Sequence, residues 1–264
     1  CHETIGSSAL FVNEKGDKAF VDKDLDKCDF CGNCVQVCPT GTMISKPFKF
    51  KARPWELRKT QSVCTLCSAQ CQVEMHSKQG KVMRVTSEDG VTVNDGNLCV
   101  GGFFGHDYLN SDQRLTAPLV AQQETSWEVA LDKVVSELSS LREEQGGQAI
   151  AGLASPHLTN EENYLFQKLF RVALNSNNID SEARFSSLRA VKVLNEQLKL
   201  NGASNPIDRI GTAEAVLVFG ADLRSESPAL NWQVQLAARK NDTRLIVANQ
   251  RQTRLVKQAE SFLQ

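Results

Sequence analysis

The nine cysteines of this chain restrict its possible folds more than any other feature. Eight of them form two groups before residue 100, and the ninth is Cys1. A secreted disulfide scaffold usually has a denser and even set of cysteines. The odd count and the repeated C-x-x-C units therefore indicate reduced thiolates that bind metal. Reduced thiolates in turn predict a reducing compartment, most simply the cytoplasm.

The first group has the spacing Cys28-x-x-Cys31-x-x-Cys34-x-x-x-Cys38-Pro39, which is typical of bacterial ferredoxins. Three cysteines this close together can bind three irons of one [4Fe–4S] cubane. The fourth, which precedes proline, ligates the other cluster in two-cluster modules. A single zinc ion is the alternative, but four cysteines so closely spaced suit a cubane better than one tetrahedral ion.

This crossing of ligands has a consequence for Cys1. The cubane of Cys28, Cys31 and Cys34 needs a fourth ligand from an earlier cysteine, and Cys1 is the only candidate in the chain. Cys38 would then serve a cluster whose other ligands precede residue 1, so we expect the chain to be truncated there. The alternative is that Cys1 is a chance cysteine and that Cys38 closes a single cluster.

The second group is Cys64-x-x-Cys67-x-x-x-Cys71 followed by the distant Cys99. The segment between Cys71 and Cys99 alternates apolar and polar residues around Gly80, which predicts a hairpin that returns the chain to the first three ligands. Four thiolates suit either zinc or a [4Fe–4S] cluster, so the spacing alone leaves both possibilities open.

Composition places the chain among ordinary globular proteins, with 264 residues of which 41% are hydrophobic. This length predicts about two domains, and the apolar residues suffice for one sizeable core, which we place in the second half. A net charge of −1 gives no basic surface for nucleic acid or lipid. The longest apolar run, 215–221, is too short to cross a bilayer. We therefore expect neither nucleic-acid binding nor membrane insertion.

Residues beyond 116 alternate between predicted helices and strands, which implies a parallel α/β sheet. Ser126 and the capping box Thr159-Asn-Glu-Glu162 mark two helix starts. The predicted helices cover 126–145, 159–174, a segment from about 181, a segment opened by Pro228, and 258–264. The predicted strands cover 148–154, 215–220 and 244–248.

Residues 61–116, which contain QSVCTLCSAQC and GNLCVGGFFGHDYLNSDQRLT, resemble the [4Fe–4S] domain that begins members of the molybdopterin oxidoreductase superfamily. This superfamily includes formate dehydrogenases and the G subunit of bacterial NADH–quinone oxidoreductase (complex I). The resemblance continues in SWEVALDKVVSEL, LTNEENYLFQKLFRVALNSNNID and AEAVLVFGADLRSESPAL, which are similar to the first α/β parts of these proteins. Upstream, CPTGTMISKPFKFKARPWEL resembles the connector between clusters in the G subunit.

The resemblance implies a fold that is α+β and then α/β. Residues 1–44 would form a ferredoxin-like [4Fe–4S] module, and 45–60 a connector. Residues 61–116 would form a small β-rich [4Fe–4S] domain of the Mo/W bis-MGD type, and 117–264 the start of a parallel-sheet α/β domain that is truncated at its C-terminal end. In the connector, the basic residues either raise the potentials of nearby clusters or form a solvated surface. We expect its aromatic residues, Phe48, Phe50 and Trp55, to pack a domain junction.

Three positions bear on whether the chain is a catalytic member of the superfamily. In catalytic members the cysteine that matches Cys99 is followed by Val-Lys-Gly, and the lysine links cluster to pterin; here the lysine position is Gly101. The metal-ligating cysteine or selenocysteine, with its histidine, follows an Ala-Arg pair, whereas here Ala183-Arg184 precedes Phe185-Ser186-Ser187. The pterin contact Asp-Pro-Arg corresponds to Asn249-Gln250-Arg251, a partial match. A molybdenum ligand at Ser186 remains an alternative, as serine serves in some relatives.

We therefore expect a fragment of the G-subunit family, truncated at both ends and without molybdopterin or a substrate-converting site of its own. It would pass electrons from NADH toward quinone through [4Fe–4S] clusters, two complete in this chain and a third served by Cys38. Its partners would be the other subunits of a membrane-associated NADH–quinone oxidoreductase, on the cytoplasmic side of the bacterial inner membrane. The alternatives are a formate dehydrogenase-type alpha subunit, a partner of an NAD-linked hydrogenase, and a zinc-binding interaction module.

The predicted metal ligands are all cysteines. They are Cys1, Cys28, Cys31, Cys34, Cys38, Cys64, Cys67, Cys71 and Cys99. The four histidines show no ligand spacing with one another, and we expect each to be a surface or packing residue. They are His2, His76, His106 and His157.

Overall fold

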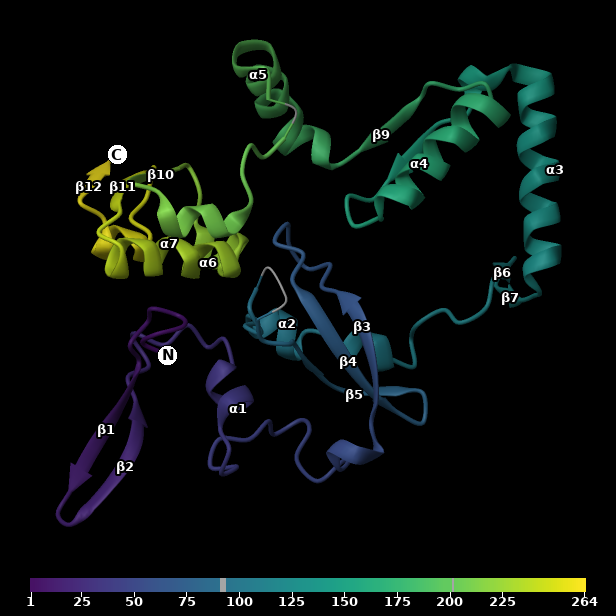
Figure 1. Ribbon diagram of the computed structural model, residues 1–264. Coiled ribbons are helices and arrows are strands. Elements are labelled where there is room, and N and C mark those ends of the chain that lie inside the picture. The colour runs from purple at the N-terminus through teal and green to yellow at the C-terminus, as the bar shows by residue number, and fades with distance from the viewer. Residues whose placement is uncertain (91–93, 201) are drawn as a thin grey trace. The chain divides into compact units, whose positions relative to one another are not determined.

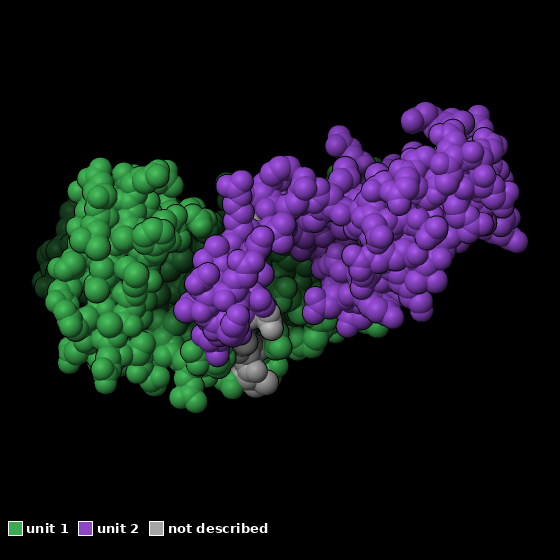
Figure 2. Space-filling view, turned by 90° about the horizontal axis from the view of Figure 1, so that it is seen from above, with its two compact units in different colours: residues 1–112, 205–264 green, residues 113–204 purple. Residues whose placement is uncertain are grey.

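A computed structural model describes residues 1–264 except 91–93 and 201, and it leaves the side chains of 186 and 187 undescribed. The chain forms two compact units, coloured separately in Figure 2. The first unit combines residues 1–112 with 205–264, and the second contains 113–204. All the predicted metal ligands lie in the first unit. Among the described residues, no helix is both long enough and apolar enough to cross a membrane.

The N-terminal part of the first unit contains a hairpin that the sequence did not predict (Figure 1). Strands β1 (Leu10–Lys15) and β2 (Lys18–Lys23) pair in antiparallel register, with Leu10 opposite Lys23. Its turn contains Gly16 at φ +60°, a conformation that glycine adopts at little cost. The short helix α1 (Asn33–Val37) then lies within the first cysteine group. The cysteine spacing does not reveal these elements.

The second cysteine group lies on an antiparallel sheet of order β3-β4-β5 (Figure 1). Its strands are β3 (Arg58–Val63), β4 (Gln72–Lys78) and β5 (Lys81–Thr86). The predicted hairpin around Gly80 is confirmed, with Gln79 and Gly80 both at positive φ in its two-residue turn. Strand β3 was not predicted, because its polar sequence RKTQSV lacks a strand-like alternation. Helix α2 (Val100–Phe104) begins directly after Cys99.

The connector does not pack as predicted. A 3₁₀ turn at Pro54–Glu56 ends it, and Trp55 and Phe50 are 81% and 93% exposed. Only Phe48 is half-buried, with the guanidinium of Arg84 4.9 Å from the centre of its ring. The prediction that these three aromatic residues pack a domain junction is therefore wrong for Phe50 and Trp55. The basic side chains of the connector are also exposed, as expected of a solvated surface; they are Lys51, Arg53, Arg58 and Lys59.

Residues 205–264 complete the first unit with a parallel sheet of order β10-β11-β12. Its strands are β10 (Ala215–Phe219), β11 (Arg244–Ala248) and β12 (Ser261–Leu263), and its helices are α6 (Leu223–Glu226) and α7 (Pro228–Lys240). The predicted strands and the helix start at Pro228 are confirmed. The predicted helix at 258–264 is wrong, because this segment pairs with β11, with Phe262 opposite Val247. Short apolar runs fit either a strand or a buried helix, and here pairing with β11 decides.

The second unit contains a long helix and a second, two-stranded parallel sheet. Its helices are α3 (Trp127–Gln145), α4 (Asn160–Lys168) and α5 (Arg189–Leu198), with π-helical turns at Leu169–Ala173 and Arg184–Leu188. Its strands are β6 (Leu119–Val120), β7 (Gln123–Glu124), β8 (Gly152–Ala154) and β9 (Ile179–Ser181). Strands β8 and β9 pair in parallel, and β6 and β7 form a small hairpin.

Local capping signals were read correctly in the second unit, whereas strand lengths were not. Ser126 caps α3 by accepting a hydrogen bond from the Val129 amide at 3.3 Å, and Thr159 forms the predicted capping box with Glu162. The predicted buried strand 148–154 is only three residues long, since 147–149 form a 3₁₀ turn. The helix predicted from about 181 is confirmed, but it begins at Arg184, because Ser181 ends strand β9.

The prediction of one sizeable core in the second half is also wrong. Among the residues that the structure describes, buried apolar side chains form three separate clusters, and one of them surrounds the second cysteine group with Val73, Val85, Leu98 and Phe103. A second cluster lies on the β10-β11-β12 sheet around Val247, and the third surrounds Phe170 in the second unit. The cysteine-rich sheet thus has a hydrophobic core of its own beneath its thiols.

Candidate metal centres

The second cysteine group converges on one cavity. Cys64, Cys67, Cys71 and Cys99 all line a space of about 320 Å³, although Cys99 is 28 residues from Cys71 in sequence. The loop of the first three ligands is closed by a hydrogen bond from the Cys64 amide to the Cys71 carbonyl at 2.8 Å. The hairpin of β4 and β5 brings Cys99 back, as the alternation around Gly80 predicted.

A buried asparagine fixes the return of the chain to this cavity. The Asn94 side chain accepts a hydrogen bond from the Gln72 amide at 2.9 Å and donates to the Asn97 carbonyl and to the Ser87 hydroxyl, also at 2.9 Å. Gln72 follows Cys71, and Asn97 lies two residues before Cys99. Asn94 therefore ties the two ends of the ligand set together, a role that no local sequence signal reveals.

The thiols of this cavity influence one another. Burial, with the neighbouring Cys67, Cys64 and Cys99, raises the pKa of Cys71 to about 12. Burial is also the main reason that the pKa of Cys64 is raised. Free thiolates are therefore unfavourable at Cys64 and Cys71, and a cationic iron or zinc centre would stabilise them as ligands. The chemistry of the donor set fits such a group.

The first cysteine group lies on a loop and the first turn of α1. The Phe30 amide donates to the Cys28 sulfur at 3.3 Å, and burial raises the pKa of Cys31, which interacts electrostatically with Cys34. Gly32 adopts φ +88°, and a Cβ at this position would lie 2.6 Å from the Phe104 ring. The backbone can therefore approach α2 this closely only with glycine between the ligands.

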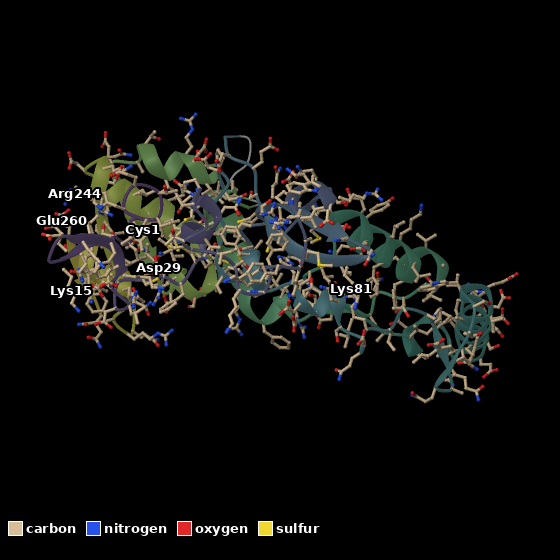
Figure 3. The ribbon with its side chains drawn as sticks, turned by 90° about the horizontal axis from the view of Figure 1, so that it is seen from below. Cys1, Lys15, Asp29, Lys81, Arg244 and Glu260 are labelled. Atoms are coloured by element: carbon tan, nitrogen blue, oxygen red, sulfur yellow. The ribbon has the colours of Figure 1, made fainter. Side chains whose placement is uncertain are left out.

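Cys38 and Cys1 occupy different surroundings from the other ligands of the first group. Cys38 lines another cavity, of about 340 Å³, and the Met43 amide and the Thr40 hydroxyl lower its pKa to about 7. Cys1 is exposed, and its sulfur accepts a hydrogen bond from the Ala9 amide at 3.2 Å and lies 3.0 Å from the Ser7 hydroxyl. Cys1 is labelled in Figure 3. Cys31 lines a different cavity, of about 280 Å³, and the assignment of Cys38 to a second cluster stays a prediction.

All nine cysteines carry free thiols. The cysteines of the second group line one cavity, but in the part of the chain that the structure describes no three His, Cys, Asp or Glu side chains lie as close together as the ligands of a single metal ion. The four histidines are surface or packing residues, as predicted. His2 and His157 are exposed, whereas His76 and His106 are buried and hydrogen-bonded through Nε2, His106 to the Gly102 carbonyl at 2.8 Å.

Two side chains of the first cysteine group make contacts with distant residues that sequence reasoning missed. Asn33, between Cys31 and Cys34, exchanges hydrogen bonds with the backbone of Leu98, which precedes Cys99. Asp29 is paired with Arg224 at 3.0 Å and with Arg254 at 3.7 Å. Because these contacts join residues 65 or more apart in sequence, spacing alone contains no signal for them.

The positions that distinguish catalytic relatives lie in the first unit, apart from 183–187, which lie in the second. Gly101 lines the cavity of the second cysteine group, and a Cβ there would lie 3.1 Å from Leu66 and 3.6 Å from the Cys99 sulfur. Arg251 pairs with Asp222 at 3.5 Å, and the Asn249 side chain donates to the Ala221 carbonyl. The side chains of Ser186 and Ser187 lie outside the described residues, so the alternative molybdenum ligand at Ser186 stays a sequence hypothesis.

The cysteine-lined cavities and the parallel sheets fit an iron–sulfur protein of the oxidoreductase class, and sequence comparison shows that class. The family model of the 4Fe-4S binding domain matches residues 21–44, and that of the molybdopterin oxidoreductase Fe4S4 domain matches 57–111. The model of molybdopterin oxidoreductase itself matches 114–262. The chain belongs to the molybdopterin oxidoreductase family, which confirms the predicted superfamily and fold class.

Several relatives extend over almost the whole chain. The alpha subunit of an NADPH–Fe(3+) oxidoreductase from Geobacter sulfurreducens is 47% identical over 99% of the chain, and the G 2 subunit of NADH–quinone oxidoreductase from Rhizobium meliloti is 36% identical over all of it. A putative formate dehydrogenase of Bacillus subtilis is 33% identical over 80% of the chain. The chain spans 31% of the length of each of the first two relatives and 22% of the third.

The fold is also found in a solved structure. Acetylene hydratase from Pelobacter acetylenicus superimposes with a TM-score of 0.60 over 78% of this chain and 29% of its own. At 16% sequence identity, this likeness concerns the fold alone.

Proposed function

We propose that this chain conducts electrons through [4Fe–4S] clusters within a multi-subunit oxidoreductase that draws its electrons from a nicotinamide nucleotide. The observation that carries the proposal is the convergence of Cys64, Cys67, Cys71 and Cys99 on one cavity. The hydrogen bonds between Asn33 and Leu98 add to it, because they join the second ligand set to the first.

The residues of each ligand set have distinct tasks in this proposal. Cys64, Cys67, Cys71 and Cys99 hold one cluster, and Cys28, Cys31 and Cys34 hold another that Cys1 completes. Cys38 serves a third cluster. A bound [4Fe–4S] cluster supplies reversible one-electron storage. The protein excludes water from the second site through the buried Cys64 and Cys71, and the amides of Phe30 and Gly102 donate to the sulfurs of Cys28 and Cys99.

Conduction, without substrate conversion at a molybdopterin, is supported by Gly101. This position carries glycine where catalytic members of the superfamily carry lysine, so the side chain that links cluster and pterin is missing. Phe185-Ser186-Ser187 likewise stands in place of the metal-ligating cysteine and histidine. A formate dehydrogenase-type alpha subunit is the alternative that these substitutions disfavour.

Two pairs of electron donor and acceptor are candidates. NADH and quinone follow from the resemblance to the G subunit of complex I and from the 36% identical relative from Rhizobium meliloti. NADPH and ferric iron are favoured by the 47% identical relative from Geobacter sulfurreducens, whose name states that activity. In either complex the partners are the sister subunits. For the NADH–quinone complex, we propose a peripheral position on the cytoplasmic side of the bacterial inner membrane.

Metal and pterin analysis of the purified holoprotein tests the proposal. The expected result is iron and acid-labile sulfide in equal amounts, cubane EPR signals after reduction, and neither molybdenum, tungsten nor pterin in stoichiometric quantity. Stoichiometric molybdenum or tungsten together with pterin would overturn the conduction proposal. Zinc in place of iron, without an EPR signal, would establish the zinc-binding module instead.

A further inference from the structure

Arg224 reaches the first cysteine group from the opposite end of the sequence. It lies on helix α6, and its Nε is 3.0 Å from Oδ1 of Asp29. Its Nη2 also donates a hydrogen bond to the Cys28 carbonyl at 3.1 Å. One guanidinium thus binds both a predicted cluster ligand and the residue that follows it.

A second arginine contacts the same carboxylate. Nη1 of Arg254, from the 3₁₀ turn at Arg254–Gln258, lies 3.7 Å from Asp29 Oδ1 and donates to the Cys28 carbonyl at 3.4 Å. The Asp29 side chain is 8% exposed, and its other oxygen, Oδ2, is buried without a hydrogen-bond partner. Two cations therefore face the Asp29 carboxylate beside the loop of the first ligands. Asp29 is labelled in Figure 3.

Arg224 also borders the second cysteine group. It lines the cavity of Cys64, Cys67, Cys71 and Cys99, and it lines a neighbouring cavity of about 280 Å³ together with Cys31 and Cys99. Cys31 belongs to the first ligand set and Cys99 to the second. The same guanidinium is therefore placed against both sets.

A purely structural role would explain only part of this arrangement. The ion pairs of both arginines with Asp29 hold the loop of Cys28 against residues 205–264, and Arg254 makes this attachment without lining either cavity. Pinning does not require that a cation line the cavity of the second ligand set. A positive charge at that place stabilises the more negative, reduced state of any cluster nearby, since charge close to a cluster is one of the protein's controls on its potential.

We propose that the positive charge of Arg224 raises the reduction potentials of two clusters together. One is the cluster at Cys28, Cys31 and Cys34, and the other is the cluster at Cys64, Cys67, Cys71 and Cys99. This inference rests on the proposed function, because it presupposes that both sets hold clusters. The negative charge of Asp29 lowers the reduction potential of the first cluster and so opposes the effect of Arg224 there.

Redox titration of the purified holoprotein, followed by EPR, tests this inference with four variants. Arg224→Gln removes the charge and Arg224→Lys keeps it. Asp29→Asn removes the opposing charge. Arg244→Gln is the matched control, since it removes an arginine from an exposed ion pair with Glu260 at 2.9 Å that borders neither cavity (Figure 3). Iron and sulfide are measured for every variant.

We expect Arg224→Gln to lower both midpoint potentials, so that the ratio of reduced to oxidised cluster at a fixed potential falls about threefold to tenfold; tenfold corresponds to about 59 mV for one electron. Arg224→Lys and Arg244→Gln should leave both potentials near those of the unmodified protein, and Asp29→Asn should raise that of the first cluster. This opposite sign is a result that loss of structure alone does not produce.

Unchanged potentials in Arg224→Gln, or a shift of only one cluster, would overturn the inference while leaving the proposed function intact. If Arg224→Gln loses iron, the Asp29→Asn variant decides: an upward shift supports control by charge, and no shift rejects it. An unmodified protein without iron–sulfur clusters would instead reject the proposed function itself. The two failures are thus distinguished by the iron content of the unmodified protein.

Discussion

The side chain of Asn33 is bonded twice to the backbone of Leu98, donating to its carbonyl at 2.9 Å and accepting from its amide at 3.3 Å. Asn33 lies between two ligands of the first cysteine group, and Leu98 lies directly before Cys99. Both residues are buried. This pair therefore links the two cysteine groups directly.

Replacement of Asn33 by alanine should weaken this link. It would leave the buried amide and carbonyl of Leu98 without these partners, and an unsatisfied buried group costs about 1–3 kcal/mol. We expect the free energy of unfolding, measured in holoprotein by chemical denaturation, to fall by about 2 kcal/mol. Asn13→Ala is the control, because its hydrogen bond to Asp22 joins the two strands of a largely exposed hairpin. Equal losses in the two variants would contradict a special role for Asn33.

A second prediction concerns the glycine beside Asn33. Gly32 and Gly41 both adopt positive φ, at +88° and +71°, so alanine at either position is strained by about 1 kcal/mol. Only at Gly32 would the new methyl group also meet a ring, 2.6 Å from Phe104, whereas nothing lies within 4 Å of a Cβ at Gly41. Overpacking costs about 1–3 kcal/mol more.

We therefore expect Gly32→Ala to lower both the iron content and the thermal unfolding midpoint well below those of Gly41→Ala. Differential scanning calorimetry and iron analysis of the two variants measure this difference. The prediction fails if both variants lose the same stability, since backbone strain would then account for the whole effect.

The fourth ligand of the first cubane is tested by a pair of serine substitutions. If the ligands cross between clusters, Cys1→Ser should remove the EPR signal of the cluster at Cys28, Cys31 and Cys34, and Cys38→Ser should leave that signal in place. If Cys38 closes a single cubane, the two results exchange. Iron analysis gives the magnitude, because the loss of one cubane removes about four irons per chain. Cys71→Ser serves as the reference for the loss of one complete cluster.

How much of this could be predicted depends on the distance in sequence between the determining residues. The ligands Cys28 to Cys38, the cap at Ser126 and the capping box at Thr159 are set by neighbours within one or two turns of chain, and spacing reveals them. The hairpin at Gly80 also follows from local alternation. Even so, the connector aromatics Phe50 and Trp55 were expected to be buried and are exposed. The prediction failed because composition does not show which apolar residues find a packing partner.

The remainder depends on contacts between distant segments. Whether 261–263 forms a strand depends on the free edge of β11, which the local sequence does not encode. Likewise, Arg224 lies 196 residues from the Cys28 carbonyl that it binds, and the sequence does not distinguish it from a solvent-exposed arginine. The two cysteine groups are therefore visible in the sequence, whereas the charged and amide groups that connect them are not; that these cysteines ligate clusters stays a prediction.

The buried network of His76 gives the chain a predictable response to pH. Arg84 Nε donates to His76 Nδ1 at 3.3 Å, so the imidazole proton is assigned to Nε2, which lies 2.9 Å from the Thr86 hydroxyl and 3.2 Å from Glu74. A second proton on Nδ1 would break the bond from Arg84 and place two cations side by side. Burial and Arg84 accordingly lower the pKa of His76, with Glu74 opposing them.

Because this pKa is lower in the folded than in the unfolded state, the unfolded chain takes up the proton first as the pH falls. The full stability of the folded state is therefore present above the ordinary histidine pKa of about 6.5, where His76 is neutral in both states. Part of this stability is lost as the pH falls through the pKa of His76 in the folded protein. We expect the free energy of unfolding to decrease between about pH 7.5 and 5.5, and His76→Gln to flatten this decrease. His157→Gln, at an exposed position, should keep the slope of the unmodified protein. The same slope in His76→Gln would show that another group causes the pH dependence.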